Sequence, residues 1–132
     1  MEYTFKLLIA GLSTVGSFLF GGWPALLQVL LMFIVIDYVT GLIAAAYSGK
    51  LSSRVGFKGI AKKIIMIAMV AVAYGIDIVL GASSFFRDAV IYFYIINELI
   101  SILENAGEVG LPLPNVLKEA IEVLKRKGNR ED

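Results

Sequence analysis

Long apolar runs separated by short polar breaks dominate the chain. No charged residue occurs between Lys6 and Asp37, and the sequence GGWP at 21–24 divides this stretch. Glycines loosen a backbone and proline suits the first turn of a helix, so we expect one helix to end and another to begin there. The pattern as a whole predicts four apolar helices, at about residues 5–20, 25–47, 64–86 and 89–105.

These segments differ in how well they fit a bilayer. Segments 25–47 and 64–86 can each cross a hydrocarbon core of ~30 Å at about 1.5 Å per residue. Segment 5–20 is diluted by glycine, serine and threonine, so it either spans the membrane or lies on its surface. Segment 89–105 follows a predicted charged turn at Arg87-Asp88. It is short for a membrane-spanning helix, so it can cross only if the bilayer is thinner there or the helix continues further.

A separate tail follows the apolar segments. Asn115 can cap an amphipathic helix over 116–127, and Gly128 is expected to end that helix. Its charged face cannot enter hydrocarbon. We therefore divide the chain into a membrane domain, 1–114, and a cytoplasmic helix with a charged tail, 115–132. Four helix-breaking residues lie at this boundary: Gly107, Gly110, Pro112 and Pro114.

Composition agrees with a membrane protein. Of 132 residues, 58% are hydrophobic and 17% are charged, with a mean hydropathy of +0.82. A soluble domain of this size cannot bury so much apolar surface, so we predict an all-α integral membrane protein. Cysteine and histidine are both absent. Without thiol nucleophiles, imidazole bases or the usual zinc ligands, neither an enzyme nor a bound cofactor is expected. The net charge of +1 gives no attraction to nucleic acid.

The distribution of basic residues predicts how the chain is oriented across the membrane. Segment 48–63 is expected to be a loop with no acidic residue, and the positive-inside rule places it and the tail, which includes Arg130, in the cytoplasm. Contact with anionic lipid is an additional role for the loop. It contains five cations: Lys50, Arg54, Lys58, Lys62 and Lys63.

Two carboxylates interrupt the apolar segments. Asp37 lies ten residues, and Asp77 thirteen, from the predicted cytoplasmic ends of their helices, so both are expected near mid-membrane. A charge there costs about 2.5–3.5 kcal/mol on insertion scales, so each group needs a partner or water. A hydrogen bond to a neighbouring helix and a water-facing role both remain open. Small residues on these helices suit close helix packing: Gly41, Ala45, Ala71 and Gly75.

The fourth segment carries one polar face. At 100° per residue, six polar side chains fall within about 120° of arc, and isoleucines and leucines cover most of the rest. This polar arc either docks on polar groups of the same bundle or lines a water-filled lesion once subunits gather. Its members are Tyr94, Asn97, Glu98, Ser101, Glu104 and Asn105.

Several stretches follow one another in a specific order and spacing: IDYVTGLIAA (36–45), GKLSSRVGFKGIAKK (49–63), YGID (74–77), YIINELISILENAGEVGLPLP (94–114) and the final helix. Together they resemble the toxin secretion/phage lysis holin family. The resemblance covers about Ile36 to Leu124. It implies a protein that accumulates, oligomerises with itself in the bilayer of a bacterium and permeabilises it, so that a cytoplasmic endolysin or toxin escapes without necessary direct contact.

Two other functions remain open at this point. A small proton- or ion-coupled transporter would use Asp37, Asp77 and Glu98 as relay carboxylates. A non-conducting scaffold would anchor a cytoplasmic partner through residues 116–127. The size of the released solute separates them, because a transporter passes ions, a holin passes folded protein and a scaffold passes nothing.

Overall fold

In the described part of the chain, the regular secondary structure is all α-helix. The computed structural model describes the backbone of residues 1–131 and the side chains of residues 1–127. Arg130, which we predict to be part of the basic cytoplasmic tail, lies outside the described side chains. The all-α prediction is confirmed. Within this range there are five helices: α1 (Glu2–Phe20), α2 (Ala25–Tyr47), α3 (Ser53–Leu80), α4 (Phe85–Glu108) and α5 (Asn115–Glu131).

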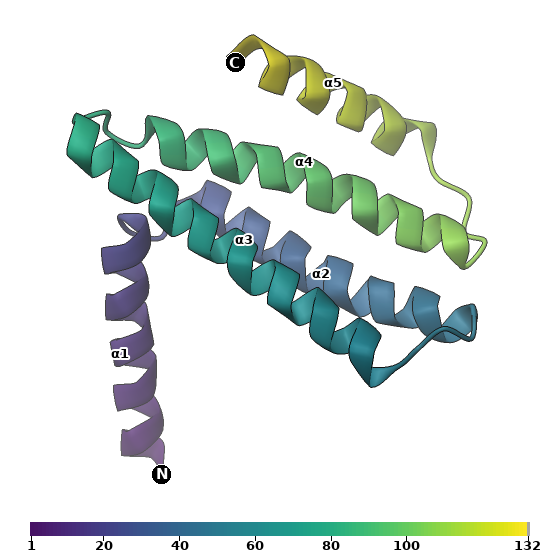
Figure 1. The fold of residues 1–132 in the computed structure, drawn as a ribbon, viewed down its shortest axis with the longest axis horizontal. Helices are drawn as coiled ribbons and strands as arrows, with labels where there is room; N and C mark the ends of the chain where they lie inside the picture. The colour runs from purple at the N-terminus through teal and green to yellow at the C-terminus, as the bar shows by residue number, and fades with distance from the viewer. Residues whose placement is uncertain (132) are drawn as a thin grey trace.

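Helices α2, α3 and α4 form an antiparallel bundle with α4 as its best-packed member (Figure 1). Helix α4 contacts both α2 and α3 along its length, whereas α2 and α3 touch each other much less. Helix α1 stands away from the bundle, and α5 returns beside α4. The apolar core occupies the half of the bundle nearest α1 and is formed by Phe20, Leu27, Leu30, Ile34, Met66, Val70, Ile91 and Ile95.

Three helices, α1, α2 and α3, are long and apolar enough to cross a membrane. Helix α4 has 24 residues, or about 36 Å, which is long enough, but it carries more polar groups. On α1, large apolar side chains such as Phe5, Leu12 and Phe18 are exposed. A continuous exposed apolar surface of this kind suits contact with lipid.

The third helix is displaced from its predicted position. It begins at Ser53 rather than 64, because the Ser52 side chain accepts a hydrogen bond from the Val55 amide and caps the helix. It ends at Leu80 rather than 86, because Gly81 adopts the left-handed conformation (φ 65°). The turn therefore lies at 81–84, and Arg87 and Asp88 belong to α4.

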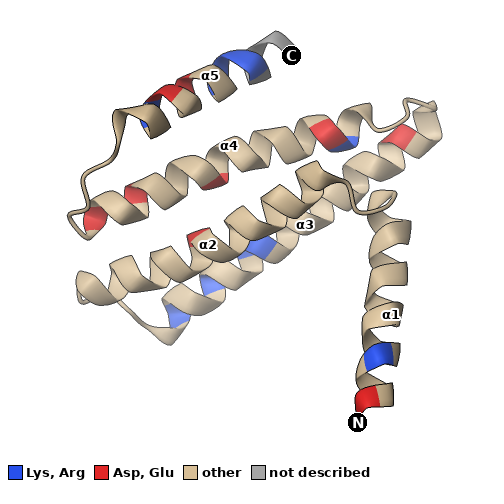
Figure 2. Cartoon of the chain, turned by 180° about the vertical axis from the view of Figure 1, so that it is seen from behind, with Lys and Arg blue, Asp and Glu red and all other residues tan. Residues whose placement is uncertain are grey.

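This displacement corrects two further predictions. Lys50 alone of the five cations lies in the connection between α2 and α3; the predicted basic loop is otherwise helical. Figure 2 shows the cations of α3 toward its N-terminal half. Helix α4 is also not short, since it runs on to Glu108. The cations that lie on α3 are Arg54, Lys58, Lys62 and Lys63.

The remaining helix boundaries lie closer to those expected. Helix α1 begins at Glu2, three residues before the predicted start, and α2 has the predicted bounds. Helix α5 continues through Gly128 to Glu131, so the prediction that this glycine ends it is wrong. One glycine inside a helix costs only about 1 kcal/mol relative to alanine, which the neighbouring residues can offset.

The turn between α1 and α2 is held by the single tryptophan. Trp23 Nε1 donates to the Ser13 carbonyl over 3.2 Å, and the indole ring lies on Gly16. A Cβ at Gly16 would lie 2.0 Å from Trp23 Cζ2. At the end of α1, Gly21 has φ 72°, and a Cβ there would lie 2.4 Å from Tyr74 Cε1. Both glycines therefore permit close contacts that no larger residue allows.

Gly16→Ala should displace the Trp23 ring and destabilise this turn by about 1–3 kcal/mol, as overpacking typically does. The chain has no other tryptophan, so Trp23 fluorescence reports on the position of this ring. Unfolding in detergent measures the change in stability. Gly11→Ala is the matched control on the same helix, because a Cβ there meets nothing within 4 Å. Identical spectra and stabilities for the two variants would contradict the packing described.

Candidate functional site

Three charged residues meet at one level of the bundle. Asp37 lies ten residues before the end of α2, Lys63 ten residues after the start of α3, and Glu98 ten residues before the end of α4. In the antiparallel bundle these three helix ends lie together (Figure 1). Each residue is therefore about 15 Å from the same end, near the middle of a ~30 Å hydrocarbon layer.

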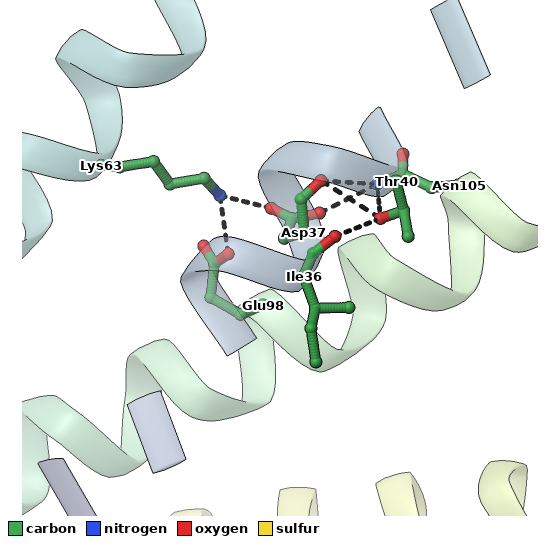
Figure 3. A network of polar contacts seen from close by, with 6 residues as sticks. All are labelled: Ile36, Asp37, Thr40, Lys63, Glu98 and Asn105. Atoms are coloured by element: carbon green, nitrogen blue, oxygen red, sulfur yellow. Dashed lines mark hydrogen bonds and ion pairs between the residues drawn. The ribbon is translucent and has the colours of Figure 1, made fainter. Parts of the chain in front are cut away.

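The Lys63 ammonium group bridges two carboxylates on different helices (Figure 3). Its Nζ donates to Asp37 Oδ2 on α2 and to Glu98 Oε2 on α4, the latter over 2.6 Å. Asp37 is 6% exposed and Glu98 is 4% exposed. We call these three side chains the central charge network. It joins α2, α3 and α4 with one cation.

An amide and a hydroxyl extend the network along α2. Asn105 Nδ2, from α4, donates to Asp37 Oδ1 and to Thr40 Oγ1, both over 3.0 Å. The Thr40 hydroxyl in turn donates to the Ile36 carbonyl over 2.7 Å. Both oxygens of the Asp37 carboxylate thus have donors, one from α3 and one from α4.

The network stabilises the bundle only while it is complete. Ions inside an apolar bundle lose hydration energy, and close pairing with hydrogen bonds offsets that loss. Removing the one cation would leave two neighbouring carboxylates in an apolar setting. Among the described residues, every buried side-chain nitrogen or oxygen has a hydrogen-bond partner. The arrangement is therefore satisfied in a single subunit.

A polar cavity of about 220 Å³ adjoins the network. It lies toward the end of the bundle where α3 begins, since Val55 and Gly59 form part of its wall. Water occupies about 30 Å³ per molecule in the liquid, so the cavity has room for several waters. The side chains with polar groups around it are those of Asp37, Tyr38, Lys62, Lys63, Ser101 and Asn105.

Asp77 occupies a different place from the one predicted. It lies three residues before the end of α3 and fourteen residues from Lys63, which is about 21 Å along the helix. The expectation that Asp37 and Asp77 share one depth is therefore wrong, because α3 begins and ends earlier than predicted. Asp77 Oδ1 accepts the Phe86 amide over 2.8 Å, and Oδ2 accepts the Arg87 amide over 2.9 Å. A carboxylate at a helix N-terminus satisfies free N–H groups and the helix dipole.

Arg87 joins this end of the bundle to α1. Its Nη1 donates to the Phe20 carbonyl over 2.8 Å and its Nε donates to Asp88 Oδ1 over 3.0 Å. The guanidinium group also lies 5.8 Å from the centre of the Tyr74 ring, within cation–π range. Arg87 is 7% exposed. The bundle is thus held by one polar cluster at mid-length and another at the α1 end.

The predicted polar arc of α4 divides in the structure. Glu98 and Asn105 face α2 and α3, and Ser101 borders the polar cavity. Asn97 and Glu104 are exposed. Tyr94 is partly buried against the apolar core. The proposed lining of a lesion by this arc remains a prediction.

The predicted small residues have different surroundings. A Cβ on Gly41 would lie 3.6 Å from Asn105 Nδ2, whereas one on Gly75 would meet nothing within 4 Å. Ala45 borders a second cavity, which residues of α2, α3 and α4 line, and Ala71 packs against the core.

Sequence reasoning missed several contacts of the site. Tyr38 of α2 lies on two glycines of α3, Gly56 and Gly59, and its hydroxyl donates to the Gly56 carbonyl over 3.2 Å. The loop predicted over residues 48–63 includes Lys63. The cap at Ser52 instead places Lys63 inside α3, level with Asp37. Within the described residues, no group of three carboxylate, histidine or cysteine side chains is placed to hold a metal ion.

Comparisons with known proteins point to one family. The sequence profile of the bacteriophage holin family matches residues 14–126. An uncharacterized protein of Listeria innocua is 49% identical over all of this chain and 94% of its own length. An uncharacterized protein of Clostridium perfringens is 40% identical over 94% of this chain and 93% of its own length. A probable holin of Bacillus phage phi105 is 30% identical over 80% of this chain and 78% of its own length. No solved structure matches the chain.

Lys63→Met should destabilise the bundle by about 3–5 kcal/mol, because it leaves two buried carboxylates without their cation. Lys62→Met is the matched control, since Lys62 is the exposed neighbour on the same helix. Unfolding in detergent micelles measures both. Adding Asp37→Asn and Glu98→Gln to Lys63→Met should restore much of the loss, since no unpaired charge then remains. Equal stability of the Lys62 and Lys63 variants would contradict a structural role for the network.

Proposed function

The chain belongs to the bacteriophage holin family, and we propose that it acts as a phage-type holin by forming homo-oligomers that permeabilise the bacterial cytoplasmic membrane. The family comprises membrane-permeabilising proteins rather than enzymes. In this proposal the cargo that escapes is a cytoplasmic endolysin, or a toxin, which need not touch the protein. The partners of the chain are the lipid bilayer and other copies of itself.

The central charge network is the observation that carries this proposal. Here Glu98 and Asn105 of α4 are engaged by α3 and α2, so a single subunit hides part of the polar arc. The same subunit leaves Asn97 and Glu104 of that arc exposed. One subunit therefore satisfies the arc incompletely.

Assembly supplies the missing environment. When several copies gather, their α4 helices turn the polar arc toward a shared aqueous space, where all six side chains are hydrated. Two states of the same chain then differ in what surrounds α4, and oligomerisation shifts the population toward the hydrated one. The exposed apolar faces of α1 and of the bundle remain in contact with lipid.

The polar cavity beside Asp37 favours a second candidate, a proton- or ion-coupled transporter. That function uses Asp37, Glu98 and Asp77 as successive relay sites. Asp77 is about 21 Å along α3 from Lys63, and both its carboxylate oxygens accept amides of α4. The geometry therefore supports the relay less well than the holin function.

Induction in bacteria together with a cytoplasmic endolysin tests the proposal. Membrane potential and external endolysin activity are followed in the same culture. A holin should depolarise the cells and release folded endolysin. Depolarisation without endolysin release would support the transporter, and neither change would support a scaffold.

Asn97→Leu with Glu104→Leu should leave insertion intact but delay or abolish endolysin release. Both side chains are exposed and outside the central charge network, so the substitution removes wet surface without breaking an ion pair. Phe93→Leu with Ile100→Leu is the control, because it keeps an apolar face apolar. Lysis on the normal schedule by the Asn97/Glu104 variant would show that α4 is not the lining.

Cysteines at Lys50 and Lys127 should resist impermeant thiol reagents in intact cells before lysis, whereas one at Ser83 should react. The chain has no cysteine of its own. Ser83 lies in the turn between α3 and α4, at the opposite end of the bundle from Lys50. The reason is the positive-inside rule, which places the basic end of α3 and the tail in the cytoplasm. The reverse labelling pattern would contradict this orientation.

A further inference from the structure

Helix α5 lies beside the C-terminal half of α4, the part of the bundle between the central charge network and the end where α3 begins. A groove of about 810 Å³ separates the two helices, with Ile100, Leu103, Glu104 and Gly107 on the α4 side. These residues follow Glu98, which is level with Asp37 and Lys63 at mid-bundle. In a bilayer that α2 and α3 cross, α5 would therefore lie at hydrocarbon depth.

The charges of α5 are incompatible with that depth. Figure 2 shows acidic and basic residues along this helix. Charged side chains at mid-membrane normally pair with each other or face a water-filled cavity. Among the described contacts, the ion pairs join residues of α2, α3 and α4 and include none from α5. The described charged residues of α5 are Lys118, Glu119, Glu122, Lys125, Arg126 and Lys127.

The contact between α5 and α4 is also slight. Among residues 115–127 of α5, whose side chains are described, only Ile121 and Leu124 are partly buried, while Val116 is 73% exposed. The connection between the helices contains Gly110 in a left-handed conformation (φ 83°), followed by two prolines. Proline stops a helix from continuing, so the connection keeps α5 separate from α4.

We propose that α5 leaves this groove in the membrane and lies on the anionic lipid surface at the end of the bundle where α3 begins. Its apolar residues cover roughly 160° of the helix, which suits burial at the boundary between headgroups and acyl chains. Lys118 and Lys125 lie beyond one edge of that face, and Glu119 and Arg126 lie beyond the other. Lys127, in the last described turn, falls within the same arc. The apolar face consists of Val116, Leu117, Ala120, Ile121, Val123 and Leu124.

Charge complementarity identifies the lipid as anionic. Residues 115–127 contain four cations and two carboxylates. The first turns of α3, at the same end of the bundle as the start of α5, add two further exposed cations, Arg54 and Lys58. Clustered lysines and arginines beside a membrane helix attract phosphate headgroups such as phosphatidylglycerol. This proposal concerns the resting subunit and does not rest on permeabilisation.

The test uses the full chain in phosphatidylcholine vesicles with and without about one third phosphatidylglycerol, an anionic fraction that supports electrostatic binding. Single cysteines at Leu117 and Glu122 carry an environment-sensitive fluorophore. With anionic lipid, quenchers near the headgroups should reach Leu117, while aqueous iodide should reach Glu122. Equal quenching at both positions, or deep quenching at either, would overturn the proposal.

Spin labels at Glu104 and Glu122 give a second, independent reading, because both residues line the groove. Their separation should increase when the protein enters anionic vesicles. A separation that stays as short as in the groove would show that α5 remains on α4.

Charge variants test the lipid specificity. Lys118→Gln with Lys125→Gln and Arg126→Gln should reduce the shallow quenching at Leu117 several-fold, and high salt should do the same by screening. Glu119→Gln with Glu122→Gln is the control, measured through the Leu117 label, and should keep or increase the quenching. Equal binding by the two sets of variants would contradict recognition by charge. Solute leakage is recorded in parallel, so that failure of surface binding and failure of permeabilisation can be distinguished.

Discussion

A charge that enters an apolar helix bundle must bring its partner with it, and the rest of this structure depends on that constraint. Lys63 supplies one ammonium group to two carboxylates, Asp37 and Glu98, from two other helices. Because all three lie ten residues from the same end of the bundle, they set the register of α2, α3 and α4 against one another. A shift of α4 by one turn would move Glu98 about 5 Å along the bundle axis and break the bridge.

The central charge network also explains why α4, which is more polar than α1, α2 or α3, is the best-packed helix of the bundle. Toward α1 the bundle is held by apolar side chains such as Leu30, Val70 and Ile91, with Asp77 capping the start of α4. Toward the other end it is held by ions, an amide and a hydroxyl, and a polar cavity adjoins them. Apolar packing is lost when water enters, whereas an ionic contact can exchange its partners for water. The polar half of the bundle is therefore the half suited to rearrangement in the proposed assembly.

The sequence predicts the helical class and the bounds of α2, because these depend on local patterns of apolar and turn-forming residues. It predicts α3 poorly, since five cations between 48 and 63 look like a cytoplasmic loop and conceal the cap at Ser52. Because α3 begins at Ser53 rather than at the predicted residue 64, the sequence does not predict the pairing of Asp37 with Lys63. The role of Asp77 was missed for a related reason: its bonds to the amides of α4 depend on a turn at Gly81. Contacts between distant segments follow from helix register, which the periodicity of one segment does not determine.

Exchanging the charges of Lys63 and Glu98 tests the network most directly. Lys63→Glu alone places three carboxylates together, and Glu98→Lys alone places two ammonium groups beside Asp37. The double variant again has one cation and two carboxylates at the same level. Its unfolding midpoint in detergent should therefore fall by no more than half of the summed decreases that the two single variants show. A double variant that loses the full sum would show that the three charges do not hold α4 to its neighbours.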